Sequence, residues 1–96
     1  GGLLLREPAA DLALCAALAS AVRDAPVPAD CILLGEVGLA GEVRPVVRLE
    51  RRLQEAARLG FKRAVVSSRE RALRGAAPLA VTGVSTLKDA LKAVMI

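Results

Sequence analysis

Apolar and polar positions in the first half of the chain predict two short strands, one helix and a β-hairpin. Residues 3–5 form an apolar run typical of a buried strand, and a helix follows over about residues 9–23. Apolar side chains occupy nearly every face of that helix, so we expect it to be covered on several sides. The apolar run 31–34 is typical of a strand buried on both faces, and residues 35–46 alternate around a turn at Ala40–Gly41, which predicts the hairpin.

The second half of the chain begins with a strongly amphipathic segment that predicts a helix over about residues 48–59. Its apolar stripe consists of Leu49, Leu53, Ala56 and Ala57. This spacing places the four side chains on successive turns of one helix face, opposite an arginine-rich half. Gly60 suits the left-handed position after the last turn, and Phe61 can fold back on that turn.

Strands and helices alternate along the remainder of the chain. We expect strands at 64–66 and 79–81, a short helix or turn over 69–74, and a terminal helix capped by Ser85 or Thr86. This alternation predicts an α/β fold with a mixed sheet, a β-hairpin and three to four helices.

Composition removes several classes of function. The chain of 96 residues has no histidine, and its one aromatic residue is Phe61. Without histidine there is no general base for Ser-His-Asp or Cys-His catalysis, and two cysteines cannot supply the four thiolates of a zinc site. A single aromatic side chain nearly excludes stacking of nucleic-acid bases. A chain of this length holds one hydrophobic core, so we expect a single domain over residues 1–96.

The cysteines and the hydropathy pattern favour a cytoplasmic protein. No apolar run reaches the roughly 18 to 20 residues needed to span a bilayer, and we expect no membrane partner. Cys15 and Cys31 both lie in apolar sequence, which favours two reduced, buried thiols. A disulfide between them is the alternative.

Charge is distributed unevenly along the chain. The net charge is +4, but residues 44–74 hold ten basic side chains against three acidic ones, and the rest of the chain holds four against seven. Nine of the ten are arginine, whose planar guanidinium suits phosphate. We consider three explanations: a solvated surface with local Glu–Arg pairs, a surface that contacts nucleic-acid phosphates, and pairing with acids of a neighbouring subunit. The candidate DNA-binding residues are Arg48, Arg51, Arg52, Arg69, Arg71 and Arg74.

Two blocks of sequence carry a resemblance to a known family. They read Gly-Glu-Val-Gly-Leu-Ala-Gly-Glu-Val-Arg-Pro-Val at 35–46, continuing through an arginine-rich stretch to residue 63, and Glu-Pro-Ala-Ala-Asp-Leu-Ala at 7–13. In both, the chain resembles the C-terminal domain of the bacterial RadA/Sms DNA-repair proteins. That domain is similar to the proteolytic domain of Lon proteases, so the resemblance implies a Lon-protease-like fold of the ribosomal protein S5 domain 2-like type.

The resemblance also implies that the Lon catalytic dyad is missing. The Lon serine lies in a Gly-Pro-Ser-Ala-Gly block, which corresponds here to residues 7–11 and places Ala9 at the serine position. The Lon lysine lies in a Gly-Gly-Leu-Lys block, which corresponds to residues 47–50 and places Glu50 at the lysine position. A methyl group cannot attack a carbonyl, so we expect a pseudo-protease, with a Lon-like Ser/Lys peptidase as a remote alternative.

What the family implies beyond this is a role in DNA repair and recombination. The chain begins with Gly1, not Met, and is expected to be the C-terminal fragment of a longer ATPase. That protein would bind zinc, ATP and magnesium in an N-terminal module and a RecA-like ATPase domain, would form a hexamer, and would act as a helicase or translocase in branch migration. For this chain the expectation is no cofactor, homo-oligomerisation, and non-specific contact with the DNA backbone. The alternative is a purely structural ring-assembly scaffold without DNA contact.

Overall fold

The computed structural model describes residues 7–70 and 78–95 and contains both parallel and antiparallel strand pairs. Its helices are η1 (Pro8–Ala10, a 3-10 turn), α1 (Asp11–Arg23), α2 (Leu49–Arg58), η2 (Ser68–Glu70, also 3-10) and α4 (Leu87–Val94). Its strands are β1 (Cys31–Leu33), β2 (Glu36–Val37), β3 (Val43–Arg44), β4 (Arg63–Ser67) and β5 (Ala80–Val84). The predicted strand at 3–5 and part of the predicted turn at 69–74 lie outside the described residues.

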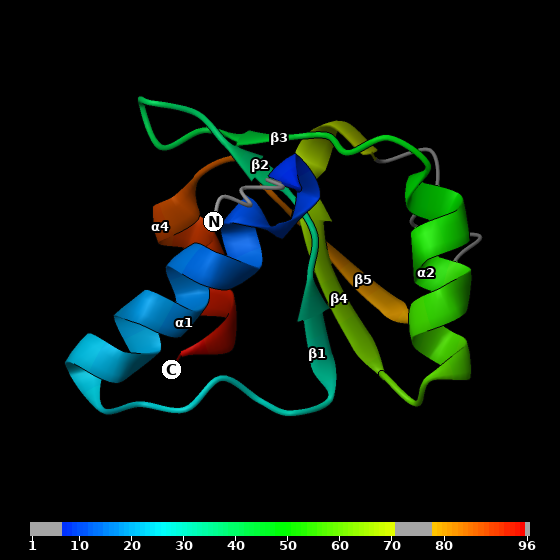
Figure 1. The fold of residues 1–96 in the computed structure, drawn as a ribbon, viewed down its shortest axis with the longest axis horizontal. Coiled ribbons are helices and arrows are strands. Elements are labelled where there is room, and N and C mark those ends of the chain that lie inside the picture. The colour runs from blue at the N-terminus through cyan, green and yellow to red at the C-terminus, as the bar shows by residue number, and fades with distance from the viewer. Residues whose placement is uncertain (1–6, 71–77, 96) are drawn as a thin grey trace, which may run out of the picture.

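The strands form two separate sheets. The first has the order β1-β4-β5 with both pairs parallel, and the second is the antiparallel hairpin of β2 and β3. Helices α1 and α4 lie on one side of the parallel sheet and α2 lies on the other (Figure 1). The α/β class, the hairpin and the pairing of both types are therefore confirmed, with each type of pairing in a sheet of its own.

The hydrophobic core has two parts, one on each face of the parallel sheet. The first is built by α1, α4 and the strands, from Leu12, Ala16, Cys31, Leu33, Val43, Val65, Val84, Ala90 and Val94. The second lies under α2, from Leu49, Leu53, Ala56, Ala64, Val66 and Leu79. The predicted apolar stripe of α2 supplies buried residues to the second cluster, and Ala90 and Val94 of α4 supply buried residues to the first, because both helices are amphipathic.

Several predicted helix ends are confirmed in detail. The Thr86 hydroxyl accepts a hydrogen bond from the backbone N–H of Asp89 at 3.1 Å, which caps α4. After α2, Gly60 has a φ of +102°, and the N–H of Phe61 donates to the carbonyl of Ala56. The turn at Gly60 and Phe61 leads the chain from α2 into β4.

The first helix differs from the prediction. Its buried side consists of Leu12 and Ala16, but Leu14 and Leu18 are each 60% exposed and Val22 is 86% exposed. The sheet and α4 contact α1 from one side only, so the expectation that it is covered on several sides is wrong for the described residues. An apolar pattern predicts which faces can be buried, and it does not specify how many neighbours are present.

The cysteines are both free, and they differ in burial. Cys31 is buried in β1, where desolvation raises the pKa of its thiol. Cys15 on α1 is only partly buried, which corrects the expectation of two buried thiols. Among the described helices, none is both long and apolar enough to cross a membrane.

Candidate functional site

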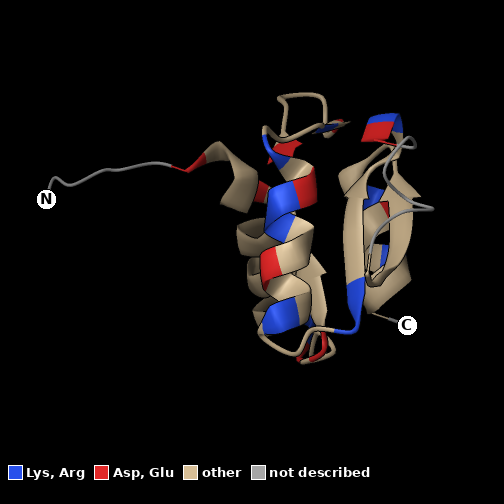
Figure 2. Ribbon diagram, turned by 90° about the vertical axis from the view of Figure 1, so that its right-hand side faces the viewer, with Lys and Arg blue, Asp and Glu red and all other residues tan. Residues whose placement is uncertain are grey.

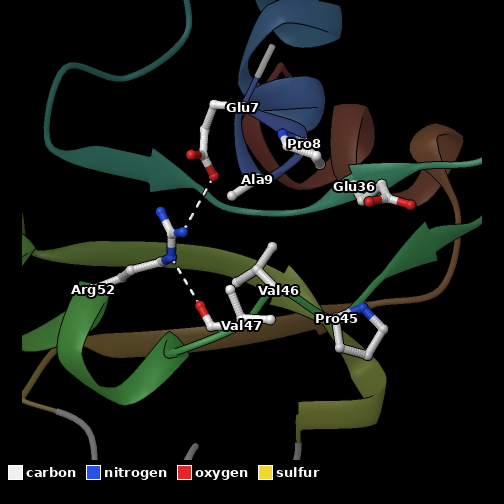
Figure 3. A pocket seen from close by; sticks show the side chains of 8 residues that line it. All are labelled: Glu7, Pro8, Ala9, Glu36, Pro45, Val46, Val47 and Arg52. Carbon is white, nitrogen blue, oxygen red and sulfur yellow. Dashed lines mark hydrogen bonds and ion pairs between the residues drawn. The ribbon is translucent and has the colours of Figure 1, made fainter. Parts of the chain in front are cut away.

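A small cleft lies where the start of the first helix meets the segment after β3. Its volume is about 160 Å³, and its walls include Pro8 and Ala9 on one side and Pro45 to Val47 on the other (Figure 3). Ala9, the residue at the predicted serine position, is 4% exposed and contributes only a methyl group. Glu50, at the predicted lysine position, is exposed on α2 and does not line this cleft.

One arginine ties the two walls of this cleft together. Arg52 of α2 forms an ion pair with Glu7, with 3.2 Å between its Nη2 atom and the Glu7 Oε1 atom. The Nε atom of the same guanidinium donates to the carbonyl of Val47 at 2.9 Å (Figure 3). Because these bonds use the guanidinium within the chain, Arg52 is less available to an external phosphate than sequence alone suggests.

The hairpin beside this cleft explains part of the Gly-Glu-Val-Gly-Leu block. Gly38 leaves room for the Glu42 carboxylate, which accepts from the N–H of Ala40 and from the Arg44 guanidinium at 2.7 Å. The Arg44 guanidinium holds the pKa of Glu42 below its ordinary value. Gly41 has a φ of +83°, which the turn requires.

The basic segment divides into paired and unpaired arginines. Among the described arginines of this segment, three besides Arg52 take part in ion pairs: Arg44 with Glu36 and Glu42, Arg58 with Glu55, and Arg63 with Asp30. Within residues 7–70 and 78–95, no ion pair is formed by Arg48 directly before α2, by Arg51 on α2 or by Arg69 in η2. Arg71 and Arg74 lie outside the described residues. Figure 2 shows α2 with both basic and acidic segments. Local Glu–Arg pairing therefore accounts for part of the basic segment. It does not account for Arg48 and Arg51, which line the same groove.

Arg48 also has an unusual backbone conformation. It precedes the first residue of α2 with a φ of +58° and a ψ of 37°, the left-handed region that side-chain-bearing residues rarely adopt. The Lon motif described above has a glycine at this position. An arginine there costs backbone strain, which residues at functional sites often carry.

A second and larger hollow, the groove between α2 and β1, was not predicted from the sequence. It lies between α2 and β1, has a volume of about 440 Å³, and joins Arg48 and Arg51 to an apolar floor that includes Ile32 and Leu34. These two side chains, in β1 and directly after it, are only partly buried, which corrects the expectation of a strand buried on both faces. The sequence does carry a sign of this groove. The apolar stripe of α2 ends in Ala56 and Ala57, whose small side chains leave part of β1 uncovered.

The described residues offer little for other kinds of chemistry. Within the part of the chain that the structure describes, no group of three His, Cys, Asp or Glu side chains is placed to hold a metal ion. The residues that line the small cleft carry no hydroxyl, thiol or amine. The features left to explain are the unpaired arginines and the apolar surfaces beside them.

Comparison with known proteins agrees with this geometry. The family model of the Lon protease (S16) C-terminal proteolytic domain matches residues 4–94. The DNA repair protein RadA of Escherichia coli is 45% identical over 91 residues, which cover 95% of this chain and 20% of that protein. The DNA repair protein RadA of Bacillus subtilis is 58% identical over 67 residues, which cover 69% of this chain and 14% of that protein. The chain thus spans about a fifth or less of these relatives, and it belongs to the Lon-protease C-terminal domain family, in the form found in RadA proteins.

Proposed function

We propose that this chain is a non-catalytic DNA-binding and assembly domain of a RadA-type DNA repair protein. The observation that carries the proposal is two exposed arginines, Arg48 directly before α2 and Arg51 on it, which form no ion pair within the described residues. The predicted dyad positions of the same domain hold Ala9 and Glu50. Loss of the nucleophile removes the family's peptidase chemistry and leaves the fold free for another task. The longer protein would supply the ATPase, with ATP, magnesium and zinc bound outside this chain.

DNA contact would be made through backbone phosphates. Arg48 and Arg51 are exposed, and neither forms an ion pair with an acid of the described residues, so both can release counterions from DNA on binding. Arg69 adds a further exposed cation from η2, and the described part of the chain offers one aromatic residue, Phe61, which is partly buried. The contact would therefore be independent of base sequence.

A charge-reversal experiment tests this contact. The variant carrying Arg48→Glu and Arg51→Glu should bind a labelled DNA duplex and a single-stranded oligonucleotide more weakly, and its salt slope should fall by about one for each phosphate that is no longer neutralised. The matched control carries Arg23→Glu and Lys92→Glu, two exposed cations outside residues 44–74 that change the net charge equally. Equal losses in both variants would show that net charge, and not a site at Arg48 and Arg51, governs DNA binding. Absence of measurable DNA binding by the unmodified chain would support the structural scaffold without DNA contact.

The outer face of α1 is the surface that we assign to assembly. Leu14, Leu18 and Val22 recur on successive turns and are exposed, and the alanines between them allow close approach of another element. A helix that is apolar on every side suits burial on every side. In a ring of six subunits, this face would contact the neighbouring copy.

Mass measurement at several protein concentrations tests the assembly. The variant with Leu14→Glu and Leu18→Glu should remain monomeric at concentrations where the unmodified chain associates. Leu39→Glu, which changes a fully exposed leucine at the hairpin tip, is the control and should associate normally. Association that survives the double change would place the subunit contact elsewhere.

A further inference from the structure

The groove between α2 and β1 has a floor that phosphate binding does not use. Ile32 of β1, Leu34 directly after it and Ala56 of α2 form this floor, and Leu59 lies at its edge. Leu59 is 66% exposed although it is a large aliphatic side chain. Phosphate oxygens gain nothing from an aliphatic surface, so the floor suits a different occupant.

The charged rim of the groove is positive once internal pairs are taken into account. The Glu55 carboxylate accepts two hydrogen bonds from the Arg58 guanidinium, at 2.6 and 2.9 Å, and Arg52 is paired with Glu7. Arg48 and Arg51 remain without an ionic partner among the described residues. An occupant that complements this rim carries negative charge.

The aliphatic floor and the cationic rim together favour one kind of partner. The volume of about 440 Å³ is sufficient for one or two large side chains. The groove lining contains no aromatic ring on which a base could stack, which disfavours a nucleotide on this floor. An aliphatic residue flanked by carboxylates satisfies both parts of the groove.

We propose that the groove between α2 and β1 binds an acidic peptide segment of a partner protein, with an aliphatic side chain on Ile32 and Leu34 and carboxylates on Arg48 and Arg51. This binding does not depend on the proposed DNA contact, but it uses two of the same arginines. Peptide and DNA would therefore compete, and an acidic partner could displace this domain from DNA.

Fluorescence anisotropy with a synthetic probe tests the proposal. The probe is a labelled Asp-Glu-Asp-Leu-Asp-Glu-Asp peptide, and its control has serine in place of leucine at equal charge. We expect the leucine peptide to bind about tenfold more tightly, because one aliphatic side chain is buried. Leu59→Ser, at the edge of the groove, should reduce this difference, whereas Leu39→Ser, at an exposed leucine outside the groove, should not change it.

Arginine variants and DNA complete the test. Arg48→Ala with Arg51→Ala should weaken binding of the leucine peptide, and unlabelled peptide should release a bound oligonucleotide from the unmodified chain. Equal affinity for the two peptides, or a leucine preference that Leu59→Ser does not reduce, would overturn the proposal. Leu59→Ser should leave DNA affinity unchanged, so failure of the peptide site and failure of the DNA site give different results.

Discussion

Helices α1 and α2 cover opposite faces of the same parallel sheet, and their outer surfaces differ completely. Both bury leucine side chains almost entirely: Leu12 at 0% exposure in α1, and Leu49 and Leu53 at 3% and 1% in α2. Outside, α2 presents arginine and glutamate, whereas α1 presents leucine, valine and alanine. The α2 surface is suited to water and to anionic partners, and the α1 surface is suited to a second apolar contact.

The prediction with the largest expected effect asks whether the inner faces of the two helices contribute equally to the free energy of unfolding. Leu12→Ala and Leu53→Ala should each lower the free energy of unfolding by about 2–5 kcal/mol, because each leaves a cavity in a closed core. Urea unfolding followed by circular dichroism measures both. A much smaller loss for Leu12→Ala would mean that α1 packs loosely, and the contrast would then extend to the inner faces.

Gly35 shows how closely the α1 side is packed. A Cβ atom at this position would lie 2.9 Å from Val43 Cγ1 and 3.3 Å from Leu12 Cδ2. Gly35→Ala should therefore lower the free energy of unfolding by about 1–3 kcal/mol through overpacking. Adding Val43→Ala removes the nearest of these atoms, so the double variant should lose less than the sum of the two single losses. Additive losses would contradict direct contact.

The sequence was sufficient to predict most helices and strands, but it was not sufficient to predict which of their surfaces are covered by neighbours. The spacing of apolar residues in α2, a cap at Ser85 or Thr86 and the turn at Ala40–Gly41 are local features, so the sequence pattern was enough to predict them. The exposed face of α1 and the groove beside Ile32 depend on which neighbours cover a side chain. That coverage is set by tertiary contacts, which an apolar pattern does not contain.

The candidate site divides in the same way. Comparison with the Lon motifs predicts Ala9 and Glu50 at the dyad positions from residue identity alone, and this assignment stays a prediction. The pairing of Arg52 with Glu7 joins residues 45 positions apart, so no local pattern could show that this arginine is engaged while Arg51 is not. Charge counting therefore identified the basic segment and could not separate its paired members from its unpaired ones.

The helix ends offer a smaller contrast. Arg48 before α2 has a φ of +58°, and Asp24 after α1 has a φ of +52°. Aspartate tolerates the left-handed region better than arginine does, so Arg48→Gly should raise the free energy of unfolding by about 1 kcal/mol and Asp24→Gly by less. Urea unfolding measures both changes. A larger gain at Asp24 would mean that the strain lies at the end of α1 and not at the start of α2.

The smallest expected effect concerns the outer face of α1. Leu18 is 60% exposed, so Leu18→Ser should change the free energy of unfolding of the dilute chain by no more than about 0.5 kcal/mol. At high protein concentration the unmodified chain should gain stability by association and the variant should gain less, because a contact made only in the folded state shifts the unfolding midpoint. A loss above about 1 kcal/mol in dilute solution would show that Leu18 is already packed within one chain. The difference between the outer faces of α1 and α2 would then lie within the monomer and would not indicate a subunit contact.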